Sequence, residues 1–267
     1  MKINGVLHLH TTYSYDGKLS LDSLKDLLIA HNVQFALITE HTDEMTKEVG
    51  EKFIKACREK SDERIILIPG FEVPYGGRHI LMIGAHRFVR GGIDNTEDNI
   101  REWKSAAEIA VFAHPHRNEY SVDGAMEDIL DGIEVWNSQY DGKYTPRFRS
   151  LALLRRLQNT GKNVHAYAGL DFHREEHEGG PRIVVENINP TFGDVINALR
   201  NARYTLERGN IIISSEGDIR SGNVFILRIK SMFFIGIVSF LKRISKYTKA
   251  LGIPIPSKLR RRIRSKL

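Results

Sequence analysis

The sequence predicts an α/β fold built on a parallel sheet over residues 1–215. Short apolar runs, several of them rich in Ile and Val and bounded by Gly or Pro, are typical of buried parallel strands. Helical patterns separate many of these runs, and this alternation favours a sheet covered by helices. Residues able to bind metal follow several runs, as expected where the carboxyl ends of barrel strands meet at one mouth. A seven-stranded barrel is therefore expected, with an open doubly wound sheet as the alternative.

The expected elements follow from hydrophobic periodicity, taken in chain order. The expected strands are 5–9, 35–39, 65–68, 80–84, 109–113, 133–136 and 164–168. The expected helices are 21–30, 44–60, 97–107, 145–160 and 191–202. Ser20 can cap the first helix, because its hydroxyl can accept a hydrogen bond from a free N–H of the first turn. Turn residues at 209–210 and 216–218 indicate the end of the domain, so 216–267 is expected to be a separate helical tail.

Charge divides the chain into an acidic body and a basic tail. Residues 221–267 contain 12 Lys+Arg and no Asp or Glu, so a net charge of +6 for the chain leaves −6 on residues 1–220. A tail of this kind is suited to an anionic surface such as lipid, nucleic acid or an acidic protein. The single cysteine, Cys57, excludes an intrachain disulfide, and the N-terminus leaves no room for a signal peptide. A cytoplasmic location is expected.

Nine residues able to bind metal are scattered along the chain, most of them just after an apolar run. They are His8, His10, Asp16, His41, Glu72, His79, His114, Asp171 and His173. Each has an ordinary structural explanation by itself, but their joint occurrence after successive strands favours a shared site. Imidazole and carboxylate ligands suit zinc, manganese or iron. Nine ligands are too many for one ion, so we expect two or three ions in one pocket, which is typical of phosphate-ester hydrolysis.

Two pairs of these residues have the spacing of a strand. His8 and His10 lie two residues apart, so on an extended strand both side chains face the same side and can bind one ion. Asp171 and His173 repeat the spacing with a carboxylate and an imidazole. The small residues that precede Asp171 permit close approach.

The same residues carry a resemblance to a known family. Six segments resemble, in order, the motifs of the PHP (polymerase and histidinol phosphatase) superfamily. They are residues 8–17, 38–43, 70–72, 78–81, 113–115 and 169–173. The resemblance covers residues 1–215 and is specific to the superfamily but not to a substrate. It implies a distorted (β/α)7 barrel that holds up to three metal ions.

The resemblance also implies how the ligands divide among the ions. The first ion would be held by His8, His10, Glu72 and Asp171. Glu72 would bridge to a second ion, held also by His79 and His114, and a third would be held by Asp16, His41 and His173. Glu40 stands where many members have Asp. Asp16 occupies a position that is His in some branches, which shifts the third site toward a harder ion such as manganese or iron.

These ligands predict a metal-dependent phosphoesterase. The expected nucleophile is a metal-bridging hydroxide, with Glu72, Asp171 and His173 as metal-site residues and no covalent intermediate. The expected substrate is a small phosphomonoester, a nucleotide or an oligonucleotide end. The alternatives are an amidohydrolase-like enzyme that cleaves a C–N bond, and a non-catalytic metal-binding PHP module. A full ligand set disfavours the module.

Three arginines are candidates for holding the substrate phosphate, because a guanidinium matches phosphate in a bidentate fork. Arg117 follows His114 by three residues, Arg78 precedes His79, and Arg182 follows Gly179-Gly180-Pro181. The glycine segment is expected to be a flexible loop at the mouth. For each arginine the plain alternative is a solvated side chain.

The tail has a helical pattern from Val224 to Lys249. One stripe holds Arg228, Ser231, Ser239, Lys242, Arg243, Lys246 and Lys249, and the opposite face is apolar. The uncharged run 231–241 is too short to span a bilayer, and Pro254 and Pro256 are expected to end the helix. Residues 224–267 therefore have three interpretations: a helix packed on the barrel, a peripheral helix at the inner face of an anionic membrane, or a nucleic-acid contact.

Overall fold

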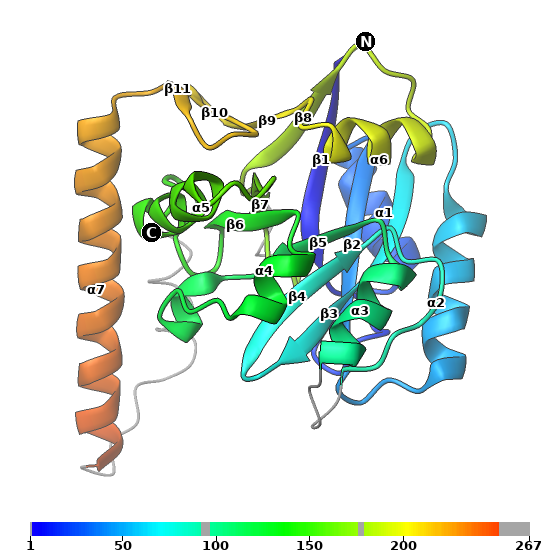
Figure 1. The fold of residues 1–267 in the computed structure, drawn as a ribbon, viewed down its shortest axis with the longest axis horizontal. Coiled ribbons are helices and arrows are strands. Elements are labelled where there is room, and N and C mark those ends of the chain that lie inside the picture. The colour runs from blue at the N-terminus through cyan, green and yellow to red at the C-terminus, as the bar shows by residue number, and fades with distance from the viewer. Residues whose placement is uncertain (1, 92–96, 176–178, 251–267) are drawn as a thin grey trace.

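The computed structural model describes residues 2–91, 97–175 and 179–250 and contains one mixed, strongly curled sheet (Figure 1). The sheet order is β11-β10-β9-β8-β1-β2-β3-β4-β5-β6-β7. The strands that correspond to the expected barrel are β1 (Lys2–Leu9), β2 (Phe35–His41), β3 (Ile66–Tyr75), β4 (Arg78–Ile83), β5 (Ile109–Phe112), β6 (Gly132–Asn137) and β7 (His165–Gly169). An α/β fold with a barrel-like sheet is thus what the periodicity predicted.

The sheet differs from a fully parallel barrel at β4. Strands β1, β2 and β3 run parallel, as do β5, β6 and β7, but β4 is antiparallel to both of its neighbours. Only Gly76 and Gly77 separate β3 from β4, and both have positive φ, at 54° and 75°. Such a two-residue turn joins antiparallel strands, whereas a parallel crossover needs a dozen residues or more. The expectation of a parallel connection was wrong at this point.

The two ends of this seven-stranded region are joined by hydrogen bonds just beyond β7. Leu170 N donates to Leu7 O at 2.8 Å, and Phe172 N donates to His8 O at 3.0 Å. His10 N donates in turn to Phe172 O at 2.8 Å. These bonds bring the segment after β7 against the end of β1, and therefore place residues 8–10 beside residues 170–173.

A second, antiparallel part of the sheet extends from the other edge of β1. It contains β8 (Arg182–Glu186), β9 (Thr205–Arg208), β10 (Ile211–Ser214) and β11 (Ile219–Ser221). None of these strands was among the expected elements, because they are short and lie beside turn residues that resemble a domain end. Residues 209–210 and 215–218 are the turns between these strands, so the sheet continues past residue 215 to Ser221.

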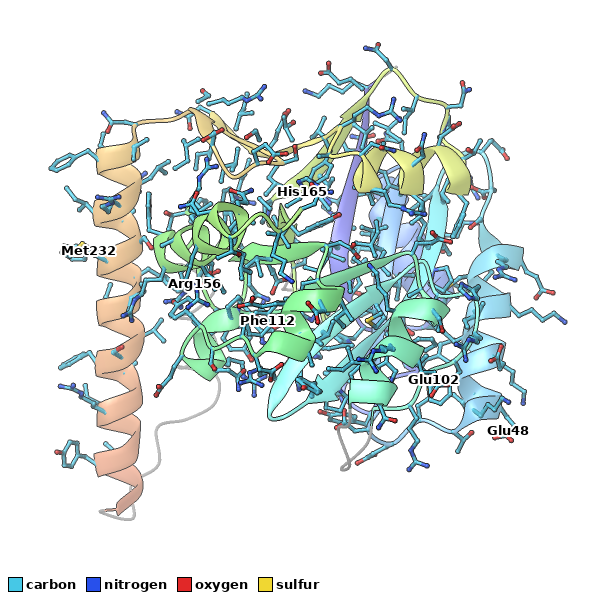
Figure 2. The ribbon with its side chains drawn as sticks, in the orientation of Figure 1. Glu48, Glu102, Phe112, Arg156, His165 and Met232 are labelled. Atoms are coloured by element: carbon cyan, nitrogen blue, oxygen red, sulfur yellow. The ribbon has the colours of Figure 1, made fainter. Side chains whose placement is uncertain are left out.

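Helices cover the sheet, and α1, α2, α4 and α6 begin at residues whose side chains cap them. They are α1 (Leu21–Ala30), α2 (Lys47–Lys60), α3 (Glu97–Ala106), α4 (Gly124–Ile129), α5 (Phe148–Asn159) and α6 (Phe192–Arg200), with a 3-10 turn η1 (Pro115–Asn118) after β5. Ser20 caps α1, since its hydroxyl accepts from Ser23 N at 3.1 Å. Helix α2 packs on β3, and α5 packs on β6 and β7. A continuous apolar core lies between these layers and includes Phe112, labelled in Figure 2.

The last described element, α7 (Val224–Ala250), stands along one side of the body (Figure 1). Its N-terminal half contacts the segment before α5, where Thr145 Oγ1 donates to Leu227 O at 3.1 Å. The stretch Val224–Leu241 is by length and composition alone long and apolar enough to cross a membrane, and 11% of it is buried. This corrects the expectation drawn from the uncharged run, although one such helix is weak evidence. The expected helix end at Pro254 and Pro256 lies outside the described residues.

Candidate metal centre

The fold brings all nine candidate ligands to one end of the curled sheet. His8, His10, His41, Asp171 and His173 lie at or just after the carboxyl ends of parallel strands, which point the same way. His79 reaches the same end because β4 is antiparallel, so that its first residues lie beside the last residues of β3. Residues far apart in the sequence therefore share one buried cluster.

Glu72 lies at the centre of this cluster and is 1% exposed. Its Oε2 lies 3.1 Å from His8 Nε2 and 3.3 Å from both His10 Nε2 and His41 Nδ1. Its Oε1 lies 2.5 Å from His79 Nδ1 and 2.9 Å from His114 Nε2. The two oxygens of one carboxylate thus face two separate sets of imidazoles.

The remaining ligands complete the cluster on the side of β7. Asp171 Oδ1 lies 3.7 Å from His8 Nε2 and 3.8 Å from His10 Nε2. Asp16 Oδ2 lies 2.9 Å from His173 Nε2 and 3.6 Å from His41 Nε2.

Four groups have ligand atoms close enough to hold an ion. They are His10-His41-His173, His8-His10-Glu72, His8-His114-Asp171 and Glu72-His79-His114. The groups overlap more than the expected division did, because His10 also belongs with His41 and His173, and Asp171 with His114.

Several buried polar atoms in this cluster make no hydrogen bond, which fits a site built for metal. Among the described residues, His10 Nε2, His41 Nδ1 and Asp16 Oδ1 are buried and lack a hydrogen-bond partner. Buried polar atoms are almost always paired in folded proteins, so unpaired imidazole nitrogens that face carboxylates need another partner. Divalent ions would supply it, because neutral imidazole nitrogen and carboxylate oxygen are their usual ligands.

The charge states of His10 and Glu72 are suited to binding cations. Burial holds the pKa of His10 well below its ordinary value, which keeps this imidazole neutral. Burial also opposes ionisation of Glu72, but His8 and His79 outweigh it and hold the pKa of Glu72 well below its usual range. Burial acts against the charged form of His8, yet Glu72, Glu134 and Asp171 raise its pKa well above the ordinary value. Ionised Glu72 and neutral His10 are the forms that bind metal.

Three ligands occupy backbone conformations that are unusual for residues with a side chain. His8, His114 and Asp171 have positive φ, at 67°, 30° and 52°. Residues other than glycine rarely adopt such angles, and each costs about 1–3 kcal/mol unless the surroundings enforce it. At His8 the pairing register between β1 and β2 shifts, so the strand turns there to aim the imidazole inward. The strained backbone angles therefore occur at residues that contribute an imidazole or a carboxylate to the cluster.

Glu134 was not among the expected site residues, but its carboxylate binds and orients His8 and His114. This residue of β6 is fully buried, and its Oε1 lies 3.0 Å from His8 Nδ1. Its Oε2 accepts from His114 N at 2.7 Å. A carboxylate on the second nitrogen of a ligand histidine fixes the tautomer that leaves the other nitrogen free for metal. The sequence signal that could have identified Glu134 is a single acidic residue within the apolar run 133–136.

Gly169 makes the contact between Glu134 and His8 possible. A Cβ at Gly169 would lie 2.0 Å from Glu134 Oε1 and 2.8 Å from His8 Cβ. The small residue before Asp171 is therefore required by the close approach of β6, β7 and β1.

Glu40 binds the loop that carries Asp16 and belongs to none of the four groups of candidate ligands. It accepts hydrogen bonds from Thr11 N at 3.0 Å, from Thr11 Oγ1 at 2.5 Å and from Ser14 Oγ. Burial raises the pKa of Glu40, although these donors act in the opposite direction. The acid before His41 thus holds the loop 11–16 in place.

The three candidate phosphate-binding arginines lie in different surroundings. Arg78 pairs with Asp123 at 2.8 Å, so its guanidinium is held by the residue that caps α4. Arg182 begins β8. Arg117 lies over the ring of Tyr140, with 5.6 Å from its Cζ to the ring centroid, and the same ring lies 5.3 Å from that of His114. Arg117 is thus one aromatic ring away from the cluster.

The expected flexible loop at 179–182 has a packed part within the described residues. Gly180 is buried, and a Cβ there would lie 2.0 Å from Ser138 Oγ. Residues 176–178 lie outside the described part.

Solved structures identify the fold. No family model matches the sequence, and no curated protein matches it either. A two-domain protein from Bacteroides vulgatus that contains a predicted PHP-like metal-dependent phosphoesterase is similar, with a TM-score of 0.59 and 16% identity over 80% of this chain and 67% of that one. The chain has a PHP-type fold. PsfC from Pseudomonas syringae is similar with a TM-score of 0.56 and 14% identity, over 89% of this chain and 99% of that one. At these identities the likeness establishes the PHP-type fold, while the site has to be argued from its own residues.

Proposed function

We propose that this protein is a metal-dependent phosphoesterase. The observation that carries the proposal is the position of Glu72, whose Oε1 faces His79 and His114 while its Oε2 faces His8, His10 and His41. A carboxylate between two imidazole groups is suited to bridge two ions. Adjacent divalent ions supply an activated water and neutralise the charge of a phosphate ester.

The ligands support a site for two to three ions of zinc, manganese or iron. His8, His10, Glu72 and Asp171 would hold one ion, and His79 and His114 would join Glu72 around another. Asp16, His41 and His173 would hold the third. Oxygen from Asp16 favours a harder ion, such as manganese or iron, at the third site.

The remaining residues of the chain position these groups and the substrate. Glu134 holds His8 in one tautomer, and Glu40 holds the loop of Asp16 through Thr11 and Ser14. Arg117 is the candidate for binding the substrate phosphate from the side of Tyr140, and Arg182 and Arg78 are further candidates. Cys57 is fully buried and lies on α2, so it is not placed to act as a nucleophile.

We propose a small phosphomonoester, a nucleotide or an oligonucleotide end as the substrate. The body is acidic, so attraction for a phosphate has to come from the bound cations and a few arginines. With a single buried cysteine the chain needs no oxidising compartment, which supports the cytoplasm as its location.

The proposal is tested with purified full-length protein reconstituted in turn with manganese, iron and zinc. We expect release of phosphate from p-nitrophenyl phosphate, or of nitrophenol from the bis ester, with at least one of these metals. His8→Ala and Asp171→Ala should abolish turnover, whereas His31→Ala, an exposed histidine at the end of α1, should leave it unchanged. A protein that binds metal but hydrolyses neither ester with any of the three would contradict a phosphoesterase.

The same preparation separates the alternatives. Cleavage of an amide or a cyclic amide, without cleavage of either phosphate ester, would indicate a C–N hydrolase of the amidohydrolase kind. Metal binding without either activity would indicate a non-catalytic module.

A further inference from the structure

Helix α7 exposes a continuous apolar stripe. Ile226, Ile229, Phe233, Phe240 and Tyr247 recur at spacings of three, four or seven residues, which places them on one side of the helix. Between 43% and 71% of each of these residues is exposed. Figure 2 shows Met232 on the same helix, pointing away from the body, and this residue is 67% exposed. Isolated apolar residues are common on protein surfaces, but a full-length stripe of aromatic and branched residues marks an interaction site.

The body covers a different side of the helix. Leu227 and Ser231 are each 4% exposed, and Thr145 binds the carbonyl of Leu227. Gly142 lies against Phe234, where a Cβ would come within 3.0 Å of the ring. Ser231, expected on the solvated polar stripe, thus faces the protein. The body and the apolar stripe occupy separate sides, so packing on the barrel leaves the stripe uncovered.

The charges of this segment identify the partner. Arg243 is exposed on the flank of α7 beside the stripe, and Arg228, also exposed, lies over the ring of Phe148 on the body. Residues 221–267 hold 12 Lys+Arg without one acidic residue, whereas the body is acidic. An apolar face combined with a large cationic excess complements an anionic bilayer, where acyl chains receive the apolar groups and lipid phosphates receive the cations.

A groove between α7 and the body extends the apolar surface formed by the stripe. It has a volume of about 400 Å³ and shares no residue with the metal cluster. Its lining includes Ile229, Phe233 and Ile237 from α7 and Tyr144 from the body, with Lys230 among the lining residues. Because Ile229 and Phe233 also belong to the stripe, the groove continues the apolar surface and is suited to hydrocarbon.

We propose that α7 lies in the plane of an anionic membrane interface and holds the protein there as a peripheral protein, at the inner face of the cell membrane. The apolar stripe lies among the acyl chains, and exposed Arg243 lies among the headgroups. This orientation leaves Thr145 bound to Leu227, with the body beside the helix and above the lipid. A spanning orientation would instead pull Arg228 and Lys230 into the hydrocarbon, where charged side chains are strongly disfavoured.

Sedimentation with vesicles tests the proposal in the full-length protein. We expect binding to phosphatidylcholine vesicles containing phosphatidylserine, little binding to phosphatidylcholine alone, and weaker binding as salt is raised. Phe233→Ser/Phe240→Ser should lower the partition coefficient by about tenfold or more. Arg243→Glu should lower it as well, whereas Arg58→Glu, with the same charge change on exposed Arg58 of α2, should have little effect. Phe192→Ser, an exposed aromatic residue at the start of α6, is the control for the stripe.

The depth of the helix is measured independently with tryptophan fluorescence. In the Phe240→Trp variant the added fluorescence should shift to the blue and be quenched by brominated lipid. In Ser239→Trp, about 100° around the helix from Phe240, the shift and the quenching should both be weaker, once the signal of the native tryptophans is subtracted. An unchanged melting temperature confirms that each variant is folded.

Each contrary result is distinct. Equal binding to neutral vesicles that persists after washing with alkaline carbonate would indicate a spanning helix, and equal quenching in both tryptophan variants would agree with it. Loss of a dimer in Phe240→Ser would indicate a second copy as the partner, and salt-sensitive binding to DNA but not to vesicles would indicate nucleic acid. Failure to bind any vesicle would also overturn the proposal. Phosphatase activity in solution is independent of these outcomes.

Discussion

At the scale of single residues, the candidate metal centre contains residues in unfavourable backbone conformations and carboxylates in buried positions. His8, His114 and Asp171 adopt positive φ, and Glu72 and Glu134 are carboxylates with almost no exposure. Each would be destabilising alone, because strain and buried charge both cost free energy. Together they offset one another, since Glu72 and Glu134 each face an imidazole. Violations of local rules concentrated in one place are expected at a functional site.

The role of Glu134 leads to a prediction about metal affinity. Glu134→Gln removes the negative charge that holds His8 Nδ1 and lets the imidazole take the wrong tautomer. We expect the affinity for metal to fall by roughly 10–100-fold, the usual effect of losing such a partner. Titration with manganese or zinc and measurement of bound metal will show it. Glu216→Gln, which alters a similar carboxylate–histidine pair at His165, should leave metal affinity unchanged.

Asp141 leads to a prediction about pH. Burial raises its pKa from 3.8 to about 6, more than Arg147 and the N–H of Asn137 lower it. The folded state then binds this proton more tightly than the unfolded state. Its contribution to stability is therefore fully present below pH 4 and is lost as pH rises through about 6. The loss is about 3 kcal/mol for a shift of this size.

Urea unfolding at several pH values measures this contribution against Asp141→Asn. The stability of the parent relative to the variant should fall between about pH 4 and pH 6 and be constant above. A relative stability that rises with pH would mean that the ion pair with Arg147 outweighs burial.

At the scale of elements, strand direction decides which ligands meet. Parallel strands bring His41 to the mouth at a carboxyl end, whereas antiparallel β4 brings His79 there at its amino end. The sequence showed a candidate ligand near most of the expected strands but not the direction of β4. Two glycines at 76–77 were the signal for a hairpin, since both central residues of such a turn need positive φ.

The attachment of α7 leads to a prediction about local stability. Thr145→Val keeps the shape of the side chain but removes the hydrogen bond to Leu227 O. We expect a loss of about 1 kcal/mol in the docking of the helix. Limited proteolysis should then cut faster near residue 222, where β11 gives way to α7. Thr205→Val, whose hydroxyl bonds Glu207, serves as the control, and equal cleavage of the two variants would show that Thr145 does not hold the helix.

At the scale of the whole molecule, the metal centre connects parts of the sheet that the chain order separates. Ligands come from β1, β2, β3 and β4 and from the segments after β5 and β7. Bound ions would therefore cross-link both ends of the curled sheet, and any ligand that binds only the folded state stabilises it.

Removal of metal should consequently lower the melting temperature. Ions at about 100 times their dissociation constant add roughly 2.7 kcal/mol, which corresponds to about 5–10 °C for a domain of this size. Dialysis against a chelator followed by scanning calorimetry measures the loss, and manganese or zinc should restore it. His8→Ala should show a much smaller response to metal. An identical melting temperature with and without metal in the parent would argue against ions that join the strands.

The sequence by itself determined the nine candidate ligands, most strand and helix positions and the basic character of the tail. These depend on local periodicity and residue chemistry, which a short window of sequence contains. Only the tertiary structure decided that Glu134 holds His8 across 126 residues, that His10 lies with His41 and His173, and which side of α7 stays exposed. Such contacts depend on strand order and on the close approach of backbone segments that are distant in sequence. Local sequence patterns carry no information about either. The strained imidazoles and the uncovered helix stripe belong to this second kind.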